Sequence, residues 1–360
     1  MRETDGTAAR TARSLNLEAT QMAGVTDTYI REQLEKRRDR LNAVLASSTP
    51  AASSAPLVAL LGEVDSALQR LANGSYGICT QCHDPVEKDR LLADPLAQLC
   101  LDHLTIDEQR ALERDLELAA RVQRGLLPST DTRHQDWLVH YQYKPAGMVS
   151  GDYCDVISSP TENGEMFFLL GDVAGKGVAA SLLMSHLHAM FRSLAGVGLP
   201  LDNLMEQANS VFCQSTIAGQ YATLICGRAG QRGEIEINSA GHLAALHVSK
   251  NGVRRIYSTG LPLGMFSTSR YTVERIRLDR GDSLLLYTDG LSEAMDESGT
   301  EYGTERLSNF VRERQGCAPQ DLAAACIKDV DAHRGGGKQL DDQTLMVVHR
   351  GTFENPSAND

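Results

Sequence analysis

The sequence lacks any apolar segment long enough to cross a bilayer, which takes about 20 residues. Its longest apolar runs, such as 166–170, are far shorter, and the chain opens on polar residues with no apolar signal region. With 42% hydrophobic and 23% charged residues, the composition is that of an ordinary globular protein. We therefore expect a folded cytoplasmic protein without a membrane partner.

The chain also lacks an excess of positive charge. It carries 35 basic and 47 acidic side chains, a formal net charge of −12, and both sides of Pro128 are acidic. Such a balance repels phosphate backbones, so we expect no nucleic-acid partner. The eight cysteines are not expected to form a disulfide framework in a cytoplasmic protein, and their spacing decides their role.

Composition and periodicity divide the 360 residues into five parts. We expect a flexible tail over 1–25, a helical hairpin with a cysteine cluster over 26–104, a linker helix over 105–127, a larger domain over 128–350 and a second tail over 351–360. A first domain of helices and a second rich in strands make this an α+β chain.

The helical parts carry heptad spacing. In the second helix of the hairpin the apolar residues are Leu57, Leu61, Val64, Leu68 and Leu71. In the linker helix they are Leu112, Leu116, Ala119 and Leu126. Two interpretations stay open: a short coiled coil that joins two chains into a homodimer through the N-terminal helices, or helices packed on their own domain.

After Pro128, short apolar runs separated by glycine predict strands near 165–171, 221–227, 234–238, 244–248, 283–288 and 343–349. Helices are predicted over 178–195, 201–216 and 319–332. Because the strands come in blocks with helices between the blocks, we expect sheets of the α+β kind.

Two pairs of metal-binding residue types stand at matched spacing. They are Cys79 with Cys82 and, after 17 intervening residues, Cys100 with His103. Two such pairs can close on one tetrahedral Zn²⁺, and four protein ligands leave no open position, which predicts one structural zinc ion. Cys79 to His83 also fits a haem-attachment motif, but that interpretation needs export and leaves the second pair unexplained.

This region resembles the DksA/TraR zinc-finger family over about residues 26–106. The residues that carry the likeness are Gly74, Tyr76, Gly77, Cys79, Cys82, Arg90, Leu91, Pro95, Cys100 and His103. His103 stands where the family often has cysteine. The hairpin tip is rich in Ser, Ala and Pro and has no acidic pair, so the family's activity in the polymerase channel is not carried over.

Aspartates sit at the ends of several apolar runs in the larger domain. They are Asp152, Asp172, Asp289 and Asp341. If the strands meet in one core, these carboxylates gather at one edge of a sheet, where they need a cation. Oxygen donors suit Mg²⁺ or Mn²⁺, and two such ions can activate water and hold a phosphoryl group. The pattern points to phosphomonoester hydrolysis.

Residues from about 118 to 350 resemble the metal-dependent (PPM-type) protein phosphatases, in the bacterial branch of SpoIIE and RsbU. The motifs run in order: Gln123-Arg-Gly-Leu126-Leu-Pro128, Ser150-Gly-Asp152-Tyr-Cys-Asp155, Gly171-Asp-Val-Ala-Gly-Lys-Gly177, Ala240-Gly-His242, Gly260-Leu-Pro-Leu-Gly264, Gly281 to Gly290, Tyr302-Gly303 and Asp341-Asp-Gln-Thr344.

The resemblance implies a four-layer α-β-β-α sandwich with two Mn²⁺ or Mg²⁺ ions at one edge. By motif position Asp172 bridges both ions, the carbonyl of Val173 adds a ligand, and Asp152, Asp289 and Asp341 complete the set. The nucleophile is then a metal-bound water, and no covalent enzyme intermediate is expected. Direct ligation by the neighbouring Asp155 and Asp342 is not expected.

Three further features have competing interpretations. Lys144 is a candidate contact for the phosphate or a solvated surface residue. Cys226 to Arg232 satisfies the C-x₅-R motif of cysteine-dependent phosphatases, but a strand-like pattern follows it, so we interpret it as a hairpin turn. His242 is expected to fix a turn at a strand end and not to act as an acid, and a role in supporting the metal ligands stays open.

The function expected from the resemblance is a metal-dependent phosphoserine/phosphothreonine protein phosphatase. Its substrate would be a phosphorylated anti-anti-sigma-type protein in a partner-switching or stress-response pathway, and the zinc module would be a regulatory or dimerising input. The alternative is a non-catalytic zinc-finger transcription regulator with a degenerate phosphatase domain. Hydrolysis of a phosphate ester with Mn²⁺ discriminates between the two.

Overall fold

The computed structural model describes residues 30–46, 55–158, 164–217 and 219–351. The chain separates into two compact units, Met1–Glu113 and Arg114–Asp360. The predicted tail over 1–25 and all but the first residue of the tail over 351–360 lie outside the described residues. No helix within the described ranges combines the length and apolar character that a bilayer span requires.

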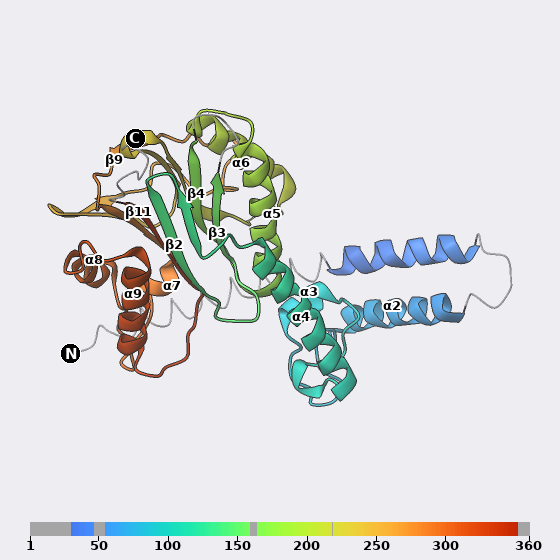
Figure 1. The fold of residues 1–360 in the computed structure, drawn as a ribbon. Coiled ribbons are helices and arrows are strands. Elements are labelled where there is room, and N and C mark those ends of the chain that lie inside the picture. Colours follow the sequence, from blue (N-terminus) through green and yellow to red (C-terminus); the bar gives the residue numbers. More distant parts are fainter. Residues whose placement is uncertain (1–29, 47–54, 159–163, 218, 352–360) are drawn as a thin grey trace, which may run out of the picture. The chain divides into compact units, whose positions relative to one another are not determined.

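The first unit contains the expected helical hairpin. Residues 30–46 are helical, and the second helix is α2 (Ala55–Asn73). Val64 of α2 is fully buried and shares a core with Ile30 and Leu34 of the first helix. The other heptad residues of α2 pack against the same core. The heptad face of α2 is therefore used within its own unit, and Figure 1 shows the two helices side by side.

The helix α4 (Ile106–Leu126) is the predicted linker helix, within one residue at each end. Thr105 and Glu108 form a capping box: the carboxylate of Glu108 accepts the backbone N–H and the hydroxyl of Thr105, and the Thr105 hydroxyl accepts the N–H of Glu108. This cap explains why the helix begins at residue 106. Pro128, two residues past its end, cannot continue it.

The second unit is built on two antiparallel sheets. The six-stranded sheet has the order β1 (Asp131–His134), β2 (Trp137–Lys144), β11 (Gln343–Arg350), β10 (Ser283–Tyr287), β7 (Ala245–Ser249) and β8 (Gly252–Ile256). The five-stranded sheet has the order β3 (Asp152–Ser158), β4 (Met166–Val173), β5 (Ala222–Ala229), β6 (Glu234–Ala240) and β9 (Glu274–Arg277).

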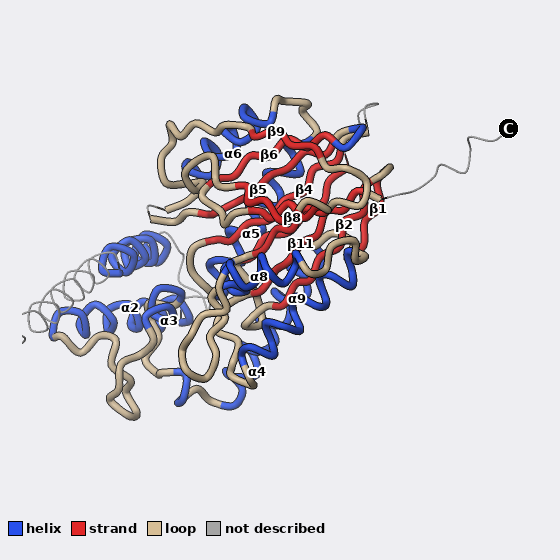
Figure 2. The backbone as a smooth tube through the Cα atoms, turned by 90° about the vertical axis from the view of Figure 1, so that its left-hand side faces the viewer, coloured by secondary structure: helices blue, strands red, loops and turns tan. Residues whose placement is uncertain are grey.

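Helices cover the outer face of each sheet. The helices α5 (Gly177–Ala195) and α6 (Leu201–Ser215) pack on the five-stranded sheet, and α8 (Thr304–Arg312) and α9 (Pro319–Arg334) pack on the six-stranded one. One apolar core lies between the sheets, where Trp137 and Phe168 are buried, and one lies under each helix layer. The α+β four-layer sandwich is confirmed, and Figure 2 shows the strands between the helices.

Candidate active site

The four aspartates converge because strand register and strand ends bring them together. In the β3–β4 pair Asp152 lies directly opposite Asp172. Asp289 begins α7 (Asp289–Ser292), immediately after β10, and Asp341 precedes β11, the antiparallel neighbour of β10. The charges of Asp289 and Asp341 both act on Asp172. Carboxylates separated by up to 189 residues in the sequence thus share one edge of the sandwich.

Three carboxyls at this edge, those of Asp152, Asp172 and Asp289, have raised pKa values. Burial, followed by the charges of Asp289, Asp341 and Asp342, raises the pKa of Asp172 to about 7. Burial and then Asp172 raise the pKa of Asp152 well above its usual range, and burial and Asp341 raise that of Asp289. A hard divalent cation, which takes oxygen ligands, offsets the negative charge of such neighbouring carboxylates.

Gly151 keeps space open beside two of the candidate ligands. A Cβ atom on this residue would lie 3.1 Å from the carbonyl oxygen of Val173 and 3.6 Å from Oδ1 of Asp172. A carboxylate and a backbone carbonyl are the donors that Mg²⁺ and Mn²⁺ take in proteins. The donor set and the space beside it therefore fit such an ion.

Two threonines to which the sequence motifs assigned no role hold Asp152. The hydroxyls of Thr288 and Thr344 donate to Oδ2 of Asp152 at 3.0 and 2.5 Å, and both threonines are fully buried. Each threonine lies within three residues of a candidate ligand in the sequence, Asp289 or Asp341. This proximity was the available signal, but it does not reveal a bond to Asp152.

Asp342 and Asp155 are engaged by protein partners. Oδ1 and Oδ2 of Asp342 accept the backbone N–H groups of Ala146 and Gly151 at 2.7 and 2.9 Å. Asp155, three residues beyond Asp152 on β3, faces the other side of the sheet. There Arg192 of α5 donates to both its oxygens, at 2.7 and 3.0 Å. Asp342 therefore positions the loop before β3, and Asp155 attaches α5 to the five-stranded sheet.

The same loop is also held by α4. Gln123 is buried, its amide nitrogen donates to the carbonyl of Ser150 at 2.7 Å, and its amide oxygen accepts the Ser150 N–H at 3.0 Å. Ser150 is two residues from Asp152. The position of this candidate ligand thus depends on the orientation of α4.

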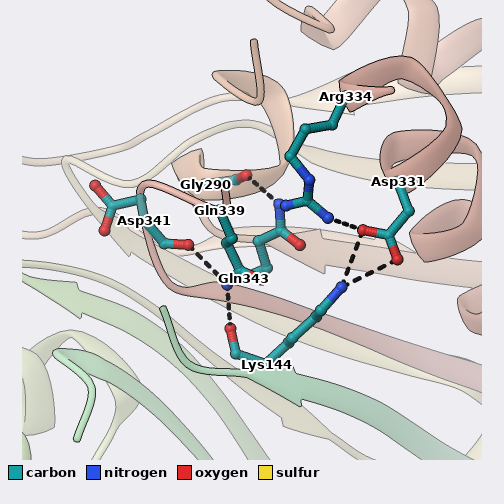
Figure 3. Close-up of polar contacts among 7 residues, drawn as sticks. All are labelled: Lys144, Gly290, Asp331, Arg334, Gln339, Asp341 and Gln343. Carbon is teal, nitrogen blue, oxygen red and sulfur yellow. Dashed lines mark hydrogen bonds and ion pairs between the residues drawn. The ribbon is translucent and has the colours of Figure 1, made fainter. Parts of the chain in front are cut away.

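Figure 3 shows how the loop before β11 is held. The side-chain amide of Gln339 donates to the carbonyls of Lys144 and Asp341, at 2.7 and 2.9 Å. The amide of Gln343 donates to the carbonyl of Gly290 at 2.9 Å. Lys144 itself donates to both oxygens of Asp331 on α9. The Lys144 ammonium group is thus bonded to α9 and to none of the four candidate ligands, which favours a structural role over a phosphate contact.

His242 joins the two sheets at the same edge. It is buried, with Nδ1 2.7 Å from the hydroxyl of Thr223 on β5 and Nε2 3.1 Å from the carbonyl of Tyr287 on β10. In the neutral ring Nε2–H donates to the carbonyl and Nδ1 accepts the hydroxyl. Burial lowers the pKa of His242 to about 4.

This pKa predicts acid sensitivity of the fold. The unfolded chain takes up a proton on His242 below about pH 6.5, whereas the folded chain resists it until about pH 4, so the free energy of unfolding falls as pH drops through that window. The loss should reach roughly 3 kcal/mol at pH 4. Urea unfolding of wild type and His242→Gln, whose amide can replace both hydrogen bonds without titrating, checks this. Identical pH slopes in the two proteins would rule the effect out.

The C-x₅-R segment is a hairpin, as interpreted from its sequence. Cys226 lies inside β5, and residues 230–233 form the turn to β6. Burial raises the pKa of Cys226 to about 12, so no thiolate is available near neutral pH. A cysteine-dependent phosphatase mechanism has no basis at this position.

The cysteine pairs of the first unit do come together. The sulfur atoms of Cys79, Cys82 and Cys100 and a ring nitrogen of His103 all lie within 4.8 Å of one another. Among the described residues no other group of three or more such side chains is this tight, so the aspartates are more widely spread. His83, the residue of the haem interpretation, is not in the cluster and occupies a left-handed turn with φ of 63°.

Comparisons with known proteins cover both units. The model of the SpoIIE family (Stage II sporulation protein E) matches residues 162–351, and that of the prokaryotic DksA/TraR C4-type zinc finger matches residues 74–102, ending one residue before His103. Protein IcfG of Synechocystis is 25% identical over 265 residues, which are 66% of this chain and 41% of IcfG. The chain thus spans less than half the length of that relative.

Two further relatives agree with the family match. The phosphoserine phosphatase RsbU of Bacillus subtilis is 25% identical over 251 residues, 67% of this chain and 72% of RsbU. The SiaA-PP2C domain of Pseudomonas aeruginosa has the same fold, with a TM-score of 0.59 at 20% identity over 69% of this chain and 98% of that domain. With its family model matching more than half of the 360 residues, the chain belongs to the SpoIIE family; its second unit has the PP2C fold, and residues 74–102 match the DksA/TraR-type zinc finger.

Proposed function

We propose that this phosphatase hydrolyses phosphoserine or phosphothreonine in a regulatory protein, with the aspartate cluster as its metal centre. The observation that carries the proposal is the convergence of Asp152, Asp172, Asp289 and Asp341, with the pKa of Asp172 raised to about 7 by burial and neighbouring carboxylates. A site with this charge favours two Mn²⁺ or Mg²⁺ ions. In the proposal Asp172 is shared by both ions, and Val173, through its carbonyl, and the other three aspartates complete the ligands.

When bound, such ions supply a water of lowered pKa and neutralise charge on the phosphoryl group. The residues of the chain do the positioning. Thr288 and Thr344 fix one oxygen of Asp152, and the proposal assigns the other to the metal. Asp342 sets the distance between the loops before β3 and β11 through its bonds to Ala146 and Gly151.

The proposed substrate is a phosphorylated anti-anti-sigma-type protein of a partner-switching or stress-response pathway. Its support is the likeness to RsbU, which is named a phosphoserine phosphatase.

One structural Zn²⁺ is proposed to be held by Cys79, Cys82, Cys100 and His103, since their donor atoms are close enough for one tetrahedral ion. The zinc module is proposed as a regulatory input that acts through α4, because α4 ends beside Ser150 with the Gln123 bonds.

The experiment uses the full chain and a phosphoserine peptide. After EDTA treatment and return of one Zn²⁺ per chain to refill the cysteine site, the rate of phosphate release should stay at least about a hundredfold below that of untreated protein, and Mn²⁺ or Mg²⁺, but not further Zn²⁺, should restore it. An aryl phosphate serves as a second substrate that needs no peptide recognition. A rate that survives complete removal of divalent ions would exclude the metal centre as the catalytic site.

A further inference from the structure

Lys176 places a positive charge among the aspartates. It lies in the glycine-rich turn between β4 and α5, at the N-cap position of α5. Its Nζ atom is 2.8 Å from Oδ2 of Asp341 and donates to the carbonyl of Leu340 at 2.9 Å. The lysine therefore binds a carboxylate that the proposed function assigns to a divalent cation.

The ion pair is exposed and can open. The Lys176 side chain is 65% exposed and that of Asp341 is 42% exposed. Ion pairs with this exposure contribute little to stability because water screens them. The charge of Lys176 also acts on Asp172 and Asp289, where it opposes the rise in pKa that burial causes. The lysine thus partly neutralises three of the four candidate ligands.

A cleft lined by Asp341, one of the four candidate ligands, connects this lysine to space for a substrate. The cleft has a volume of about 360 Å³, and its wall includes Lys176, Lys338, Asp341 and Asp342. No arginine is among the described residues that line it. A phosphate dianion bound beside the aspartates requires positive charge, and Lys176 is the lysine already bonded to a candidate ligand.

We propose that Lys176 is the residue that contacts the phosphate of the substrate, and that divalent cations release it from Asp341 for this role. The inference rests on the proposed function. The Lys176 ammonium group and a divalent ion held by Asp341 would compete for this carboxylate and repel each other. The released side chain stays in the loop that follows Asp172 and Val173, beside the same cleft, and its long stem lets the ammonium group reach an incoming anion.

The test compares the full-length wild type with Lys176→Gln, Lys176→Arg and the control Lys250→Gln. Lys250 is exposed and follows β7, outside this cleft. Mn²⁺ binding, measured by calorimetry without substrate, should be roughly threefold to tenfold tighter in Lys176→Gln, because the competing cation is gone. Inhibition of peptide hydrolysis by inorganic phosphate should be about tenfold weaker in Lys176→Gln and largely retained in Lys176→Arg.

Each outcome is decisive. Tighter Mn²⁺ binding with weaker phosphate inhibition in Lys176→Gln alone supports the proposal. Unchanged or weaker Mn²⁺ binding shows that Lys176 does not compete for Asp341, and unchanged phosphate inhibition shows that it does not contact the anion; either result overturns the proposal while the metal centre stands. A wild type that binds no Mn²⁺ overturns the metal centre, and the role of Lys176 with it.

Discussion

Asp172→Asn is expected to lower kcat/KM for a phosphoserine peptide by about a thousandfold or more. The substitution removes the carboxylate that the proposal shares between two ions, and a neutral amide does not replace its charge. The measurement is phosphate release at saturating Mn²⁺, with calorimetry to follow ion binding. After EDTA treatment the same variant should unfold at a higher temperature than wild type, because a buried carboxyl repelled by its neighbours has been neutralised.

The matched control is Cys226→Ala. Cys226 is fully buried, so alanine is preferred to serine, whose hydroxyl would be placed in an apolar core. This variant should retain activity within about threefold of wild type once its fold is verified. Loss of activity in Cys226→Ala with retention in Asp172→Asn would reverse the assignment and return the C-x₅-R motif to consideration.

Cys100→Ala is expected to abolish zinc binding and to unfold the first unit. Cys79 and Cys100 are both part of the small apolar core of that unit, so the proposed ion and the core share the same residues. Structural zinc contributes on the order of 10 kcal/mol to folding, more than a core of this size supplies. Zinc content per chain and the loss of helical circular dichroism from the hairpin are the measurements.

Two further variants serve as controls for this zinc prediction. His103→Cys supplies a fourth thiolate and should keep one zinc ion per chain. Cys213→Ala, in α6 and outside the cluster, should also leave the zinc content unchanged. A Cys100→Ala protein with full zinc content and an intact hairpin would show that these residues are not the ligands.

The six strands that the sequence predicted are those with continuous or alternating apolar runs. The strand β4 and the strand β10 are almost entirely buried, and such strands appear in a sequence as continuous apolar runs. Five strands were missed. The strands β1, β8 and β9 lie at sheet edges and are more exposed, with charged residues such as Arg254 and Arg275. The strands β2 and β3 are mostly buried, but polar residues such as His140 and Asp155 interrupt their apolar runs. No continuous hydrophobic pattern therefore marks any of the five.

The candidate site likewise has residues that the sequence predicted and residues that it did not. The aspartates were predictable because each stands at the end of an apolar run, where chain geometry leads to a common edge. The groups that hold these aspartates in place were not predictable from the sequence. Gln123 reaches Ser150 across 27 positions, Thr344 reaches Asp152 across 192, and Lys176 reaches Asp341 from another loop. Such contacts depend on the folded arrangement of loops, which no local spacing encodes.

The carboxylate of Asp342 links two loops through its hydrogen bonds and so affects the positions of residues in both. By bonding Ala146 and Gly151 it ties the segment that leads into β3 to the one that leads into β11, so the separation of Asp152 and Asp341 is set by a side chain assigned to neither ion. Related proteins could therefore differ in ion preference through changes in these hydrogen bonds, with every coordinating residue preserved. Divergence in metal selectivity should then be sought at position 342 and its two amide partners.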